Sequence, residues 1–284
     1  MCLLGWSGAT PALAQLRLPD QFQLFYSNDS NAAPKIDRWR TVAASGEWLW
    51  NVDPSRQFGL RLEAEIVAPV YLHAPGPTPD RPFAGLLTVM GYDYRRSGPI
   101  ETGFGLGIAA IGPQTGLSDF LDAAHSVLGG VPVGAAIANG QVANDLFVEA
   151  RGEIAATYAI SGLYVRPFVA ARTGAEKLVR AGIDLAWPDP PALQRRPVTG
   201  ALHSAPLGGV QIGAGVDVAH VAQTALIPAG SAVTATPRRY RARLSLGFPV
   251  GNTRAELGLA WLSREFETQQ TGQFVGTLGL TWAF

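Results

Sequence analysis

The feature that most constrains the fold is a two-residue alternation of apolar and polar side chains that recurs along most of the chain. It is clearest in residues 57–66. One face of that segment holds Phe58, Leu60, Leu62, Ala64 and Ile66, and the other holds Gly59, Arg61, Glu63 and Glu65. The same period runs through residues 145–157, 239–248 and 273–284. Because successive side chains of a strand point to opposite faces, the chain is predicted to be all-β.

Two architectures share this alternation. In a soluble sandwich the apolar face forms the core, whereas in a membrane barrel it meets lipid and the polar face fills the lumen. Long segments favour the barrel, because a tilted membrane strand needs about ten residues. Aromatic residues near segment ends suit an interfacial girdle. Charged sets that could pair across a narrow lumen are Glu63/Glu65, Glu149/Arg151/Glu153 and Arg239/Arg241/Arg243.

Counting the segments gives about twelve strands, an even number that suits a closed antiparallel barrel. They cover residues 21–27, 41–50, 58–67, 85–95, 100–109, 145–160, 163–173, 176–187, 209–223, 239–250, 253–267 and 273–284. The final residue, Phe284, resembles the terminal aromatic signal of outer-membrane barrels. We therefore predict one transmembrane antiparallel β-barrel domain over residues 15–284, located in the bacterial outer membrane.

Composition agrees with a membrane location. Charged residues make up only 15% of the chain, against roughly 25% in soluble domains. Lys and Arg total 22 and Asp and Glu total 22, so no polyanion-binding surface is expected and nucleic acid is not an expected partner. Residues 1–14 are predicted to be a signal-peptide remnant, because Ala12-Leu13-Ala14 matches a cleavage site. The single cysteine, Cys2, allows no intrachain disulfide.

One stretch breaks the strand pattern. Residues 107–125 begin as a strand, turn at Gly112-Pro113 and continue as an amphipathic helix, which we place near residues 115–128. The helix ends near His125, so this imidazole is presented to the neighbouring turns and is the candidate chemical centre. The uncharged run 126–144 contains too many glycines for a membrane helix and is predicted to be a loop.

Two polar turns are candidates for further roles. Asn28-Asp29 follows the first strand, where Asn and Asp ordinarily form turns, although their oxygen atoms also suit Ca²⁺. Spacing alone favours the turn. Asp80-Arg81 opens the fourth strand and is predicted to form an ion pair that locks a turn.

These pieces together resemble the outer-membrane lipid A 3'-O-deacylase family. The matching elements are Asn28-Asp29, Asp37-Arg38 with Thr41, Asp80-Arg81-Pro82-Phe83-Ala84-Gly85, Ile111-Gly112-Pro113 with Ala123-Ala124-His125, and Ser263-Arg264-Glu265-Phe266. They occur in order over nearly the whole chain. The family fold is a twelve-stranded barrel, which agrees with the strand count.

The resemblance implies a Ca²⁺-dependent carboxylic ester hydrolase that removes the 3'-linked acyloxyacyl chain of lipid A. By position, His125 would be the general base that activates water, and Asp29 would help hold Ca²⁺. Asn28 would position water, the imidazole or the oxyanion, and Thr41 would contribute an oxygen near the metal. The implied partners are lipopolysaccharide and the outer-membrane bilayer, and we expect a monomer.

The chain departs from the family pattern at Ser30, at Val42-Ala43 and at Leu121, which leaves the exact lipid open. Two other functions also remain open. One is a serine-type phospholipase with Ser118 or Ser45 as nucleophile and His125 as base. The other is a non-enzymatic barrel or small pore.

Overall fold

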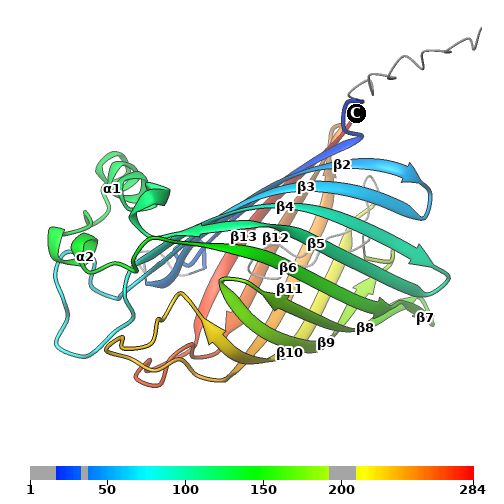
Figure 1. The fold of residues 1–284 in the computed structure, drawn as a ribbon. Helices are drawn as coiled ribbons and strands as arrows, with labels where there is room; N and C mark the ends of the chain where they lie inside the picture. The colour runs from blue at the N-terminus through cyan, green and yellow to red at the C-terminus, as the bar shows by residue number, and fades with distance from the viewer. Residues whose placement is uncertain (1–16, 33–37, 192–208) are drawn as a thin grey trace, which may run out of the picture.

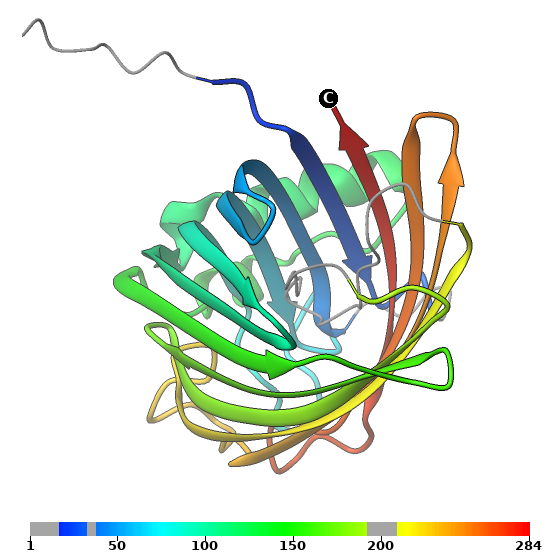
Figure 2. The ribbon, with the colours of Figure 1, turned by 90° about the vertical axis from the view of Figure 1, so that its right-hand side faces the viewer.

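The computed structural model describes residues 17–32, 38–191 and 209–284, and these residues form a closed antiparallel β-barrel (Figures 1 and 2). The strands are β1 (Gln21–Asn28), β2 (Trp39–Asp53), β3 (Arg56–Ala68), β4 (Ala84–Ser97), β5 (Ile100–Ile111), β6 (Asp145–Ala156), β7 (Tyr158–Ile160), β8 (Leu163–Thr173), β9 (Glu176–Trp187), β10 (Gln211–Thr224), β11 (Arg238–Val250), β12 (Thr253–Leu262) and β13 (Gln273–Ala283). Residues 1–16, which include the predicted signal-peptide remnant, lie outside the described part.

The barrel closes in two places. β1 pairs with β13, which joins the two ends of the chain, and β6 pairs with β8. β7 continues β6 beyond Thr157 and also pairs with β8, so the thirteen segments make twelve barrel strands. The predicted all-β barrel and its strand number are confirmed.

Exposure shows which face of the wall meets the membrane. Along β3, Leu60 and Leu62 are exposed, whereas Arg61 and Glu63, which alternate with them, are buried. The apolar side chains therefore point out of the barrel and the charged ones point into it, which is the arrangement of a membrane barrel. Within the part of the chain that is described, no helix is long and apolar enough to cross a membrane.

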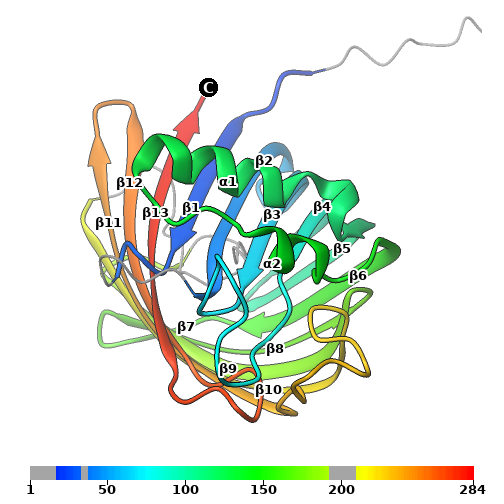
Figure 3. The ribbon, with the colours of Figure 1, turned by 90° about the vertical axis from the view of Figure 1, so that its left-hand side faces the viewer.

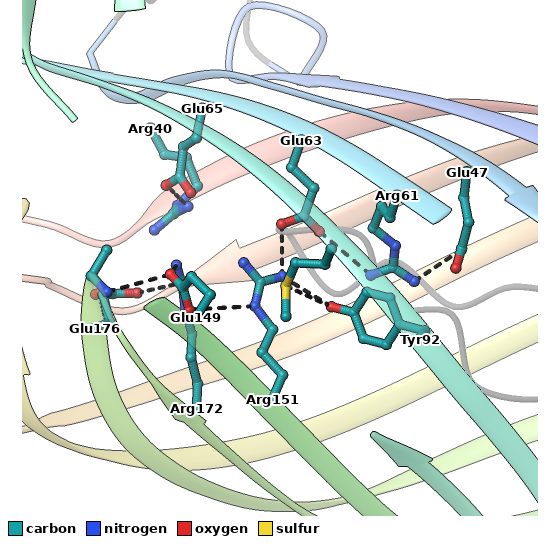
Figure 4. Close-up of polar contacts among 12 residues, drawn as sticks. Arg40, Glu47, Arg61, Glu63, Glu65, Tyr92, Glu149, Arg151, Arg172 and Glu176 are labelled. Atoms are coloured by element: carbon teal, nitrogen blue, oxygen red, sulfur yellow. Dashed lines mark hydrogen bonds and ion pairs between the residues drawn. The ribbon is translucent and has the colours of Figure 1, made fainter. Parts of the chain in front are cut away.

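Ion pairs cross the lumen (Figure 4). Arg151 on β6 pairs with Glu63 on β3 at 2.6 Å, and Arg239 on β11 pairs with Glu176 on β9 at 3.0 Å. These pairs link strands that are not neighbours, as the alternating charges predicted. Within the described part of the chain, buried charges such as Arg61, Glu149 and Arg243 have partners of opposite charge, as a low-dielectric interior requires.

An apolar cluster fills the lumen near the end that carries the long loops. Its buried members are Val67, Ala84, Leu86, Ala109, Ile111, Val142, Ala175 and Leu226. They come from the adjacent strands β3, β4 and β5, from the turn between β8 and β9, and from the segments that follow β5 and β10. Charged and apolar layers are therefore stacked along the lumen.

Outside the wall lies α1 (Leu117–Leu128), which follows a short 3₁₀ helix η1 (Pro113–Thr115) after β5 (Figure 1). Its residues Leu117 and Leu121 pack with Val42 and Ile66 in one buried cluster. Ile66 belongs to the outward face of β3, so the helix covers the outer surface of the barrel rather than its lumen. Gly85 allows the contact, because a Cβ there would stand 2.7 Å from the Leu117 Cβ.

Two predicted segments were wrong. The run 126–144 is not all loop, since α1 extends to Leu128 and a second helix, α2 (Ala135–Asn139), follows. α2 forms because Ile137 can be buried in the cluster under α1, a contact invisible in the local sequence. The strand predicted over 253–267 ends at Leu262, after which the chain turns inward to place Glu265.

Gly85 should control how α1 sits on the wall. Replacing Gly85 with Ala forces its methyl group against Leu117 and Thr115, at a cost of roughly 1–3 kcal/mol. We expect faster proteolysis of the segment 129–141 and a lower melting temperature in detergent. Gly91→Ala is the matched control, because its Cβ would meet only Phe58 at 3.6 Å. Equal behaviour of the two variants would contradict this packing.

Candidate functional site

Asn28 and Asp29 stand where β1 ends, and they differ in their surroundings. Asn28 shares the outward face with Tyr26, whose hydroxyl accepts a hydrogen bond from its Nδ2 at 2.9 Å. The Asn28 Oδ1 accepts the Ser30 backbone N–H at 2.6 Å, which is the ordinary turn interaction of this residue type. Asp29 is 1% exposed, and its Oδ2 accepts the Arg38 backbone N–H at 2.7 Å.

Thr41 lies in an irregularity of β2. The pairing of β2 with β3 shifts between Arg40 and Val42, so Thr41 is the extra residue of a bulge. Its side chain is fully buried, and the Oγ1 has no hydrogen-bond partner among the described residues. The register of β1 with β2 pairs Asn28 with Val42, which puts Asp29 beside Thr41 where the ladder stops. Asp37 lies outside the described residues.

His125 lies in the last turn of α1 and is half-buried. The chain turns back at Gly129, in the left-handed region with φ 75°, and Gly130 then covers the imidazole ring so closely that a Cβ there would stand 2.7 Å from it. The His125 Nδ1 lies 2.6 Å from the Val131 carbonyl oxygen. Since a carbonyl only accepts, Nδ1 carries the proton and Nε2 is the basic nitrogen.

The register shows how α1 lies relative to β1. Asn28, Val42, Ile66 and Gly85 form one row across β1 to β4. That row spans three strand spacings, about 14 Å, and α1 rises about 12 Å from Leu117, over Gly85, to His125. Figure 3 shows α1 lying across these strands. The helix therefore carries His125 from β4 towards the β1 side of the wall, where Asn28 ends its strand.

A second cluster lies on the inner side of the same region. Glu265 accepts from Arg40 at 2.9 Å and from Arg81 at 2.6 Å, and Arg40 also pairs with Glu65. The predicted Asp80–Arg81 pair was therefore wrong. Asp80 instead accepts the Val70 and Arg81 backbone N–H groups, while the Arg81 side chain reaches into the barrel.

Sequence reasoning missed this cluster. Three of the motif segments each supply one member: Arg40, Arg81 and Glu265. Two of these residues are positive and one is negative, and this match of charges was the signal that the sequence offered for their pairing. The meeting depends on contacts between segments that are far apart in the sequence, which a local pattern does not encode.

Glu265 lies beyond the end of β12, and its pKa reflects its neighbours. Burial raises the pKa of this carboxyl, but the guanidinium groups of Arg40, Arg239 and Arg81 outweigh burial and hold it well below its usual range. The carboxylate is therefore charged at neutral pH and ties the segment 263–269 to the wall.

Comparison with solved structures places the fold. LpxR from Salmonella typhimurium superposes with a TM-score of 0.81, over 93% of this chain and 100% of that one, at 17% identity. The chain has the fold of LpxR. An outer membrane channel from Pseudomonas putida F1 superposes with a TM-score of 0.50, over 98% of this chain and 100% of that chain, at 10% identity. No protein-family model and no curated protein matches the sequence.

The protein is thus an outer-membrane β-barrel of bacteria. The likeness to LpxR covers 93% of this chain, so it is not confined to one part of the barrel. An identity of 17% compares folds and leaves the chemistry to be argued from this chain's own residues.

The Glu265 cluster should respond to acid. A carboxyl whose pKa is lowered on folding stabilises the native state at pH values above its pKa in the unfolded chain. That stabilisation is lost as the pH falls through the pKa of the folded state. We expect hydrogen-exchange protection of residues 263–269 to hold from pH 7 down to 4.5, the ordinary carboxyl value, and to fade at lower pH.

Glu265→Gln is the matched variant for this experiment. It should lose roughly 3 kcal/mol of protection at pH 7, because two guanidinium groups lose their carboxylate. The remaining protection in this variant should not change with pH. Protection of the wild type that is flat from pH 7 to 3 would argue against the ion cluster.

Proposed function

We propose that the protein is an esterase of the outer membrane that removes the 3'-linked acyloxyacyl chain of lipid A. One observation carries the proposal: the helix that holds His125 crosses the row of wall residues that ends at Asn28. The ordered motifs resemble the lipid A 3'-O-deacylases, and LpxR, a lipid A 3'-O-deacylase, has the same fold. The motif resemblance and the likeness in fold both support the proposal.

His125 is suited to act as the general base. Its Nδ1 proton is held by the Val131 carbonyl, which fixes the tautomer and leaves Nε2 to take a proton from water. The proton on Nε2 then returns to the departing alkoxide, which completes hydrolysis of the ester.

Asn28 is suited to orient groups around the reacting carbonyl. Its Oδ1 is fixed by Ser30 and one N–H is fixed by Tyr26, so the second N–H of the amide has a defined direction. A preorganised donor of this kind stabilises an oxyanion at little reorganisation cost.

The residues present fit a hard cation at Asp29 and Thr41. The Asp29 carboxylate and the Thr41 hydroxyl are both buried at the end of the β1–β2 ladder, and the Thr41 Oγ1 has no partner among the described residues. Oxygen donors of this type suit Ca²⁺. Bound Ca²⁺ would polarise the ester carbonyl and stabilise the negative charge that develops on its oxygen.

The described residues hold no group of three or more His, Cys, Asp and Glu side chains placed for a metal ion. A Ca²⁺ ion held there would therefore need the hydroxyl, backbone carbonyls and water as ligands in addition to the single carboxylate. Such a site is weakly charged and should bind Ca²⁺ with modest affinity.

The alternative functions fit less well. Ser45 faces the lumen with Glu47, whereas His125 lies on the outer side of the wall, so the two cannot form a nucleophile–base pair. Ser118 lies seven residues before His125, about 10 Å along α1. A pore is disfavoured because ion pairs and an apolar cluster occupy the lumen.

Replacing His125 with Ala should lower release of the acyloxyacyl chain by roughly 10²–10⁴-fold, because the general base is lost. The measurement is mass spectrometry of lipid A incubated with the purified protein. His73→Ala is the control, since that imidazole is exposed on a loop. Full activity of the His125 variant would refute the proposed base.

Chelation should abolish the activity, and added Ca²⁺ should restore it. Thr41→Val removes a proposed oxygen donor and should raise the Ca²⁺ concentration needed for half-maximal activity by about tenfold, while Thr41→Ser keeps the hydroxyl and should stay near wild type. Asp29→Asn should raise it further. Activity that persists in chelator would remove the metal from the mechanism and leave the role of His125 to be judged separately.

A further inference from the structure

The lumen holds a cavity of about 190 Å³ that the proposed hydrolysis does not use. Seven arginines and three glutamates line it, together with tyrosines and small residues. It lies on the inner side of the barrel wall, away from the outer surface on which α1 packs. In the same measure a single water needs about 10–15 Å³, so the cavity has room for a tetrahedral anion with its waters.

Several of the arginines that line the cavity pair with carboxylates that do not line it. Arg151 pairs with Glu63, and Arg172 pairs with Glu149 at 2.7 Å, yet neither glutamate lines the cavity (Figure 4). The three glutamates that do line it, Glu153, Glu176 and Glu265, are each paired with at least one arginine. The exposed charge of the cavity surface is therefore positive.

The excess of positive charge is greatest around Asp217. This one carboxylate accepts from Arg180, from Arg241 at 3.1 Å and from Arg243 at 3.0 Å. Arg180 and Arg241 line the cavity, whereas Asp217 does not. Three guanidinium groups share one carboxylate here, with the nearby Asp184 taking part of the Arg243 charge.

A buried donor is left over at the same cavity. The Arg239 side chain is 9% exposed and pairs through Nη1 with Glu176 at 3.0 Å. Its Nε–H is buried and has no hydrogen-bond partner among the described residues. A buried donor without a partner is costly, and an acceptor that reaches it recovers that cost.

We propose that this cavity binds a phosphate group, either inorganic phosphate or a small phosphate monoester. Arginine forks match the oxygen geometry of phosphate, and several of them converge on the cavity. A divalent anion offsets the excess charge that Arg180 and Arg241 present and accepts from the Arg239 Nε–H. This binding is independent of the ester hydrolysis proposed for the outer face.

The test is calorimetric titration of the purified full chain in detergent with sodium phosphate and, separately, with glucose 1-phosphate, against sodium chloride at matched ionic strength. Inorganic phosphate alone should bind if the cavity accepts only the free ion, and both should bind if it accepts a monoester. Either result supports the site. No heat above that of chloride in both titrations overturns it.

The variant Arg180→Gln/Arg241→Gln distinguishes the cavity from surface binding. Asp217 keeps Arg243 in this double variant, so the fold should survive, which far-ultraviolet circular dichroism and heat-modifiable gel mobility would verify. Phosphate affinity should fall at least tenfold. The control Arg56→Gln/Arg95→Gln removes the same charge from exposed pairs with Asp93 and should bind as wild type.

An equal loss of affinity in both double variants would overturn the assignment, because it would mean that net charge governs binding. If the cavity variant does not fold, the single variant Arg239→Lys replaces it. Lysine keeps a positive charge for Glu176 and lacks the Nε–H fork, so it should weaken phosphate binding at least threefold with little effect on folding. Unchanged affinity in that variant would also count against the site.

Discussion

The structure depends on pairing every charge that the strand alternation directs into the lumen. A closed barrel leaves each inward side chain away from bulk water, and an unpaired guanidinium or carboxylate there would cost several kcal/mol. The chain meets this constraint with ion pairs that reach across strands, such as Arg151 with Glu63 and Arg239 with Glu176. These contacts fix the relative height of distant strands, so the lumen network also specifies the register of the barrel.

This constraint explains why the fold could be predicted from the sequence. Alternation is a local property, and each charged residue such as Glu63 or Arg241 marks the inner face of its own strand. Twelve strands with a filled lumen follow from counting those segments. The ends of the strands could not be derived in this way. β12 ends at Leu262, and the segment after it places Glu265 against Arg40 and Arg81. Arg81 and Arg40 lie 184 and 225 positions before Glu265, so a local pattern does not contain these contacts.

The members of the candidate site stay predictions, whereas the structure describes where they lie. Asn28-Asp29, Thr41 and His125 came from the family resemblance, while their arrangement depends on three local features. Asn28 and Asp29 have different surroundings because successive residues alternate, Thr41 is displaced by a bulge, and Gly85 lets α1 approach the wall. Bulges and close approaches arise from tertiary contacts, so neither is visible as a sequence pattern.

The barrel wall is only one strand thick, and it separates two different chemical environments. On the outer side, α1 packs on Val42 and Ile66 and carries the imidazole of His125, whose Nδ1 lies against the Val131 carbonyl oxygen. On the inner side, arginines surround a polar cavity that hydrocarbon cannot enter. Arg40 and Thr41 are consecutive, yet one belongs to the lumen cluster and the other to the end of the β1–β2 ladder. The bulge at Thr41 lets these two consecutive residues take up different surroundings.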